Sequence, residues 1–112
     1  MNILTPDTVN AELQRIIQES SKAPQAIYEA EKKLAEAEYA YEREKALQFM
    51  NAEGTVADRE ALSKFQSSEL RLAADIAKAE LNRVRSKAKQ LADAGILTAT
   101  LAKSVEMTYR NG

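Results

Sequence analysis

The chain contains no cysteine, no histidine and no tryptophan among its 112 residues. Without cysteine there is no disulfide framework and no thiolate nucleophile. Without cysteine and histidine, the usual structural zinc sites are excluded as well. Acid–base catalysis would have to use carboxylates, lysine or tyrosine. The 3 glycines are too scattered to form a phosphate-binding loop. We therefore expect a protein that is not an enzyme and that uses no cofactor or metal.

Long apolar segments are missing as well. No apolar run approaches the length of about 20 residues that crosses a bilayer. Residues 1–6 lack the basic segment and apolar core of a signal peptide. The absence of cysteine agrees with a reducing compartment. These features predict a soluble, cytoplasmic protein with no membrane partner.

Glycine is scarce, and Gly54 is the only one before residue 95. It lies between two long alanine-rich runs that favour helix, so the segment 53–55 predicts a tight turn. Thr55 and Asp58 follow with the spacing of a capping box. The chain is therefore expected to fold back on itself at Gly54. The predicted fold class is all-α: a long antiparallel helical hairpin, coiled-coil-like, with short N- and C-terminal helices.

The helix boundaries follow from the few proline, glycine and threonine residues. Thr5 and Pro6 form a helix start, and Pro24 interrupts the helix and can open the next one. Gly95 is expected to end or bend the last long helix, after which Thr98 can cap a short one. A single domain over residues 1–112 is expected. Its helices are predicted at 5–21, 24–52, 55–94 and 97–110.

Apolar residues recur at steps of three and four, which is coiled-coil spacing. In the first hairpin helix the predicted seam consists of Ile27, Ala30, Leu34, Ala37 and Tyr41. In the second hairpin helix the bulky residues are expected to face it: Leu62, Phe65, Leu72, Ile76, Val84, Ala88 and Leu91. Because 20 residues of the chain are alanine, the buried stripe is small for a monomer. We therefore expect a homo-oligomer.

A basic stripe is the first candidate for function. Its members recur every seven residues: Lys64, Arg71, Lys78 and Arg85. A phosphate-binding ridge is one interpretation. Reflection about Gly54, however, places Glu44 opposite Lys64, and Glu38 and Glu31 one residue from the positions opposite Arg71 and Lys78. Pairing across the hairpin is therefore the favoured interpretation for these three bases.

The second candidate is the basic cluster, which consists of Arg83, Arg85, Lys87 and Lys89 and contains no acid. Only Glu12 and Glu19 on the first helix are expected close enough to neutralise it. Tyr28 is expected at a similar level of the hairpin, where it could stack on a base. These five residues form the predicted nucleic-acid-binding site. The alternative is an ordinary solvated helix face.

The block Tyr39-Ala40-Tyr41-Glu42-Arg43 through Glu53-Gly54-Thr55-Val56-Ala57-Asp58-Arg59-Glu60-Ala61 resembles short helical proteins of bacteriophage genomes. Such proteins tend to be encoded among replication and recombination genes. The order of the helices also resembles loosely that of phage recombination mediators of the UvsY type. The resemblance implies an oligomer that binds single-stranded DNA and has a recombinase or another protein as partner.

Two classes of function thus stay open. The first is a non-enzymatic, oligomeric phage accessory protein that handles single-stranded DNA as a recombination mediator. The second is a protein-binding helical adaptor or inhibitor, or a structural coiled-coil component. The second class would depend on apolar residues expected off the seam, such as Leu70, Leu81 and Leu101.

Overall fold

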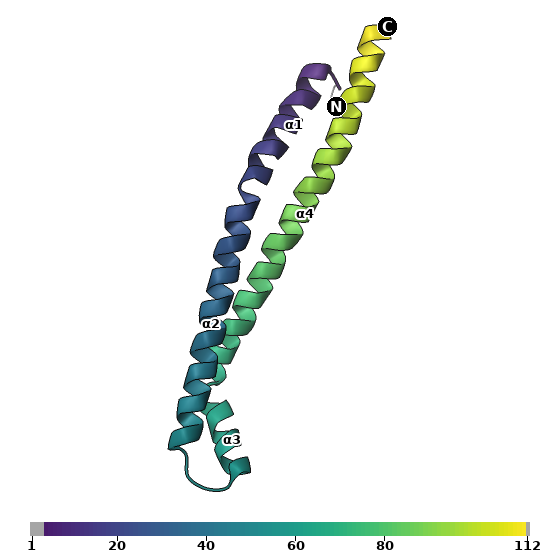
Figure 1. Cartoon of the computed structure of the whole chain (residues 1–112). Coiled ribbons are helices and arrows are strands. Elements are labelled where there is room, and N and C mark those ends of the chain that lie inside the picture. The colour runs from purple at the N-terminus through teal and green to yellow at the C-terminus, as the bar shows by residue number, and fades with distance from the viewer. Residues whose placement is uncertain (1–3, 112) are drawn as a thin grey trace. The chain divides into compact units, whose positions relative to one another are not determined.

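The computed structural model describes residues 4–111, and this part of the chain contains four α-helices and no strand. The helices are α1 (Pro6–Ser21), α2 (Ala23–Asn51), α3 (Val56–Gln66) and α4 (Ser68–Asn111) (Figure 1). The predicted all-α fold class is confirmed. The chain divides into two compact units. We call Ile27–Arg83 the hairpin unit, and Met1–Ala26 with Val84–Gly112 the terminal unit.

In the hairpin unit, α2 runs antiparallel to α3 and the first part of α4, and the chain reverses at residues 52–55 (Figure 1). Gly54 adopts a φ of +111°, which glycine tolerates far better than other residues. A Cβ atom there would also lie 3.2 Å from Asp58 Oδ2. Asp58 is fixed by the predicted capping box, because its N–H donates to Thr55 Oγ1 at 3.1 Å and its carboxylate Oδ2 accepts from the Thr55 N–H at 3.4 Å. The reversal therefore requires glycine at position 54.

Arg59 fastens α3 to the end of α2. Its Nε and Nη2 both donate to the Phe49 carbonyl oxygen, at 3.2 and 3.0 Å. That carbonyl belongs to the last turn of α2, where intrahelical donors are missing. The guanidinium carbon also lies 4.3 Å from the centre of the Phe49 ring. The Arg59 side chain thus supplies hydrogen-bond donors to a carbonyl at the end of α2 and also makes a cation–π contact with the Phe49 ring.

The expected helix over 55–94 is interrupted at Ser67, which corrects the sequence-based prediction. Ser67 has φ −100° and ψ 8°, outside the helical region. Its hydroxyl donates to the Ser63 carbonyl at 2.6 Å, and the Ser68 hydroxyl donates to the Phe65 carbonyl at 2.8 Å. Serine hydroxyls that bond backbone carbonyls in this way compete with the helical ladder and bend helices.

The inner face of α3 and α4 in the hairpin unit consists of Ser63, Ser67, Leu70, Ala74, Ala77 and Leu81. These residues alternate at steps of four and three and are buried or half-buried. Ser63 and Ser67 are only 2% and 0% exposed. The predicted seam of α2 faces inward as expected, with Ala30 buried and the other four members half-buried.

The prediction of which residues of the second hairpin helix face α2 is wrong in this unit. Leu62, Phe65, Leu72 and Ile76 are all exposed, whereas Leu70 and Leu81, expected off the seam, lie on the inner face. Small residues on the inner face let the two helices approach closely, and bulkier residues would hold them apart. The inner face therefore combines four small residues with Leu70 and Leu81, while Leu62, Phe65, Leu72 and Ile76 stay outside.

In the terminal unit, α1 lies along the C-terminal part of α4 (Figure 1). Val9 and Ile16 of α1 and Val105 of α4 are buried. A Cβ atom on Gly95 would lie 3.5 Å from Cγ2 of Ile16, so Ile16 packs over this glycine. Because Gly95 has ordinary helical geometry, α4 continues to Asn111. The separate helix predicted at 97–110, with Thr98 as its cap, is therefore not formed.

The first helix break is close to its predicted position. Thr5 caps α1, and its N–H and hydroxyl bond reciprocally with Thr8 at 3.0 and 3.2 Å. Only Lys22 separates α1 from α2. Pro24 occupies the second position of α2. An N–H in the first turn of a helix has no intrahelical acceptor, so the missing N–H of proline costs no hydrogen bond there.

The two glycines give a matched pair of stability predictions. Gly54→Ala is expected to lower the free energy of unfolding by about 1–3 kcal/mol, because alanine is strained at positive φ and its Cβ crowds Asp58. Gly95→Ala is expected to raise it by about 0.5–1 kcal/mol, because alanine favours the helix interior. Urea unfolding followed by circular dichroism measures both. Equal effects of the two substitutions would contradict the described backbone.

Candidate functional site

The outer face of the hairpin unit consists of Leu62, Phe65, Leu72 and Ile76, on α3 and α4. Phe65 is 78% exposed, Leu72 59% and Ile76 61%. Leu72 lies midway in sequence between Leu70 and Ala74 of the inner face, about 200° from each around the helix. The helix is therefore apolar on two opposite sides, and only the inner side is covered within the hairpin unit. An amphipathic surface helix has only one apolar stripe.

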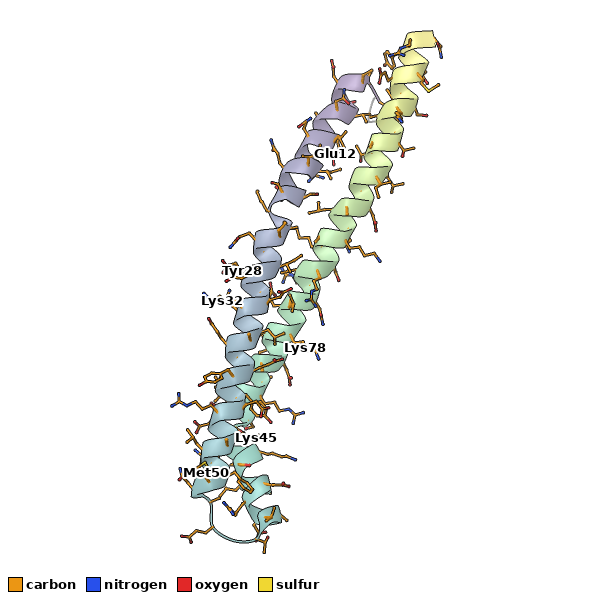
Figure 2. All side chains as sticks on the ribbon, in the orientation of Figure 1. Glu12, Tyr28, Lys32, Lys45, Met50 and Lys78 are labelled. Carbon is orange, nitrogen blue, oxygen red and sulfur yellow. The ribbon has the colours of Figure 1, made fainter. Side chains whose placement is uncertain are left out.

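One flank of the hairpin, between its inner and outer faces, is charged. Lys64, Arg71 and Lys78 each follow an inner-face residue directly. Arg71 and Lys78 line a hollow of about 270 Å³ together with Glu38 of α2, the acid that reflection about Gly54 places near Arg71. Figure 2 labels Lys78 on α4. This flank therefore brings basic and acidic residues of the two helices to one hollow.

Four uncharged residues on the opposite side form what we call the uncharged flank: Ala40 and Leu47 on α2, and Gln66 and Ala73 on the other side. The acidic Glu69, which directly precedes Leu70, lies next to it. Apolar or small residues beside a coiled-coil seam are typical of helices that contact more than one neighbour. The uncharged flank thus extends the outer face toward α2.

Near the turn, a hollow of about 490 Å³ lies between α2 and α3. Its lining includes Lys45, Phe49 and Met50 from α2 and Lys64 from α3 (Figure 2). Glu44, expected to pair with Lys64, instead accepts a hydrogen bond from Gln48 Nε2 at 2.8 Å. Met50, 71% exposed, gives this end of the hairpin another apolar contact point.

The basic cluster is divided between the two units. Arg83 belongs to the hairpin unit, where its Nη1 lies 3.9 Å from Glu80 Oε2. Arg85, Lys87 and Lys89 belong to the terminal unit, and all three are exposed. Arg85 is already engaged by another group. The expectation that the whole cluster lacks partners is therefore wrong for Arg83 and Arg85.

Helical spacing also spreads the cluster around α4. Arg85 and Lys89 are four residues apart and share one side, whereas Lys87 lies about 200° away from each. Lys87 lines a hollow of about 240 Å³ with Glu19 and Lys22. Tyr28 is 58% exposed and belongs to the hairpin unit. The five predicted residues therefore do not gather on one side of one helix.

The two acids expected to neutralise the cluster are paired on their own helix. Arg15 donates to Glu12, with Nη2 2.6 Å from Oε1 and Nε 3.1 Å from Oε2. Lys22 Nζ lies 3.3 Å from Glu19 Oε1. The hydrogen bonds from Arg15 lower the pKa of the Glu12 carboxyl from its ordinary value. Figure 2 marks Glu12 on α1.

The outer face is the functional feature that sequence reasoning missed, because its bulky residues were assigned to the core. The charged residues did not resolve the choice. Charges flank a coiled-coil seam both directly after and directly before core positions, so Lys64, Arg71 and Lys78 agree with a core at 63, 70 and 77 and with one at 65, 72 and 79.

In comparisons with known proteins, no family model, no curated protein and no solved structure matches this chain. The resemblance to phage recombination mediators therefore stays a prediction. Within residues 4–111, no helix is long and apolar enough to span a membrane. The same part of the chain holds no group of three acidic residues placed to bind a metal ion.

The Glu12–Arg15 pair gives a pH-dependent prediction. In Arg15→Gln the pKa of Glu12 is expected to rise toward its ordinary value, because the charged donor is lost. Since the pKa is lowered in the folded state, the pair stabilises the protein above the unfolded pKa and loses this effect as the pH falls through the folded pKa. The stability difference between the two proteins should therefore shrink toward acidic pH. NMR titration of Glu12 measures the shift, and an unchanged midpoint would contradict it.

Proposed function

We propose that this chain is a non-enzymatic interaction protein that binds helices of other protein chains through the outer face of its hairpin unit. The observation that carries the proposal is the exposure of Phe65, Leu72 and Ile76 on the side opposite the inner face. Burying one such side chain fully is worth about 1.5–3 kcal/mol relative to leaving it in water. Three or four of them can therefore supply much of the energy for binding a partner helix.

The arrangement of charge supports the same function. On the charged flank, Arg71 and Lys78 share a hollow with the acidic Glu38, so opposite charges already lie together there. Leu47 and Ala73 on the uncharged flank carry no charge, so they need no oppositely charged residue on a partner. A partner helix can therefore lie against the outer face without burying an unpaired charge on that flank.

Site-specific photo-cross-linking tests this function. With benzoylphenylalanine in place of Leu72, we expect light-dependent covalent adducts with a protein in the cells that produce the chain. The control places the same residue at Tyr39, which is equally exposed but lies on α2 away from the outer face. Adducts at position 72 alone support the proposal. No adduct at 72, or equal adducts at both positions, would refute it.

A second candidate function is single-stranded DNA handling by an accessory protein of phage recombination. The observation that favours it is the charge of the terminal unit, whose sequence has seven basic and five acidic side chains, a net charge of +2. The hairpin unit has nine basic and twelve acidic side chains, a net charge of −3. Arg85, Lys87 and Lys89 lie on the positive unit. Nucleic acid would therefore bind there through backbone phosphates.

This candidate predicts salt-dependent binding of a single-stranded oligonucleotide, measured by fluorescence anisotropy at several salt concentrations. Changing Arg85, Lys87 and Lys89 to Gln should lower the slope of log K against log salt by roughly 2, at about 0.7 for each lost phosphate contact. The matched control changes Lys32 and Lys33 of α2, both exposed, and should leave the slope unchanged. If the triple variant binds like the wild type, the candidate is removed.

A further inference from the structure

We infer that the partner on the outer face is a second copy of this chain, with its α4 antiparallel to the first and the two copies crossing at Ile76. The inference rests on the proposed function, because it names the occupant of the same face. It concerns the part of α4 that lies in the hairpin unit, residues 68–83.

The charges beside Ile76 are self-complementary. Glu69 lies seven residues before Ile76 and Arg83 seven residues after it, and all three are exposed. Residues seven apart share one side of a helix in a coiled coil. An antiparallel copy centred on Ile76 reverses this order, so Glu69 of each copy meets Arg83 of the other. Two identical ion pairs then form, one on either side of the centre.

The apolar residues follow the same symmetry. Leu72 and Ala79 lie on the outer side of α4 beside Ile76 and are exposed. In an antiparallel pair they alternate with Ile76 along the contact, because three- and four-residue steps interleave when one helix is reversed. A two-fold contact of this kind uses the same surface on both copies, which is the commonest symmetry of homodimers.

A parallel arrangement in register leaves the charges unmatched. A parallel copy in register would place Glu69 against Glu69 and Arg83 against Arg83, and like charges at such positions oppose association. The contact between Arg83 and Glu80 within the chain is long, at 3.9 Å, and the Arg83 side chain is 82% exposed. Arg83 therefore keeps donors available for a second carboxylate.

Charge exchange tests the inference on the full-length chain. Analytical ultracentrifugation at low salt should show a wild-type dimer. Glu69→Arg and Arg83→Glu should each weaken the dimer by about tenfold or more, because each change turns two attractive pairs into repulsive ones. The double variant restores both pairs with reversed polarity and should recover dimerisation. Glu36→Arg on α2 controls for the change in net charge, and circular dichroism verifies that each variant is helical.

Two results would overturn the inference: a monomeric wild type at millimolar concentration, or a double variant that dimerises no better than the single variants. These results are distinct from failure of the proposed function. If cross-linking at position 72 captures a different protein while the chain is monomeric, the outer face binds partners but the second copy is not one of them. If position 72 gives no adduct at all, both proposals fall.

Discussion

The close approach of α2 to α3 and α4 is the constraint on which the hairpin unit depends. Small side chains are the most buried part of this contact, since Ser63 and Ser67 are 2% and 0% exposed. Leu70 and Leu81 share this inner face, whereas Leu62, Phe65, Leu72 and Ile76 lie outside it. The outer face and the narrow inner face therefore have one physical cause.

Much of the fold could be predicted because local signals determine it. Gly54 predicts a chain reversal, and Thr55 with Asp58 predicts a helix start directly after it. The structure has both features. The seam of α2 was also predictable, because Ile27, Ala30 and Leu34 have coiled-coil spacing with no competing apolar stripe. Where one periodic pattern is present, it identifies the buried face.

The second hairpin helix carries two apolar stripes. The stripe with the larger side chains was predicted to be buried, and it is the exposed one. Hydrophobicity alone selects Phe65 and Leu72 for the core, since burying large side chains yields the most free energy. The structure instead buries the stripe that contains Ser63, Ser67 and Ala74. Lys64, Arg71 and Lys78 flank either stripe equally well, so charge spacing could not choose between the two.

The helix boundaries and the basic cluster depended on contacts that the sequence alone does not reveal. Ser67 interrupts its helix because neighbouring serine hydroxyls bond backbone carbonyls, and Gly95 continues its helix because Ile16 packs over it. Only Glu12 and Glu19 were expected to neutralise the cluster at 83–89, yet Glu80 lies on the same helix with Oε2 3.9 Å from Nη1 of Arg83.

The size limit on the inner face can be measured directly with one pair of variants in α2. Ala30 is buried and Ala35 is exposed on the same helix, so leucine at the two positions adds equal volume to opposite sides. The account predicts that Ala30→Leu lowers the free energy of unfolding by about 1–3 kcal/mol through overpacking. Ala35→Leu should leave it within about 0.5 kcal/mol. If Ala30→Leu is as stable as the wild type, the contact at Ala30 has no size limit and the account is contradicted.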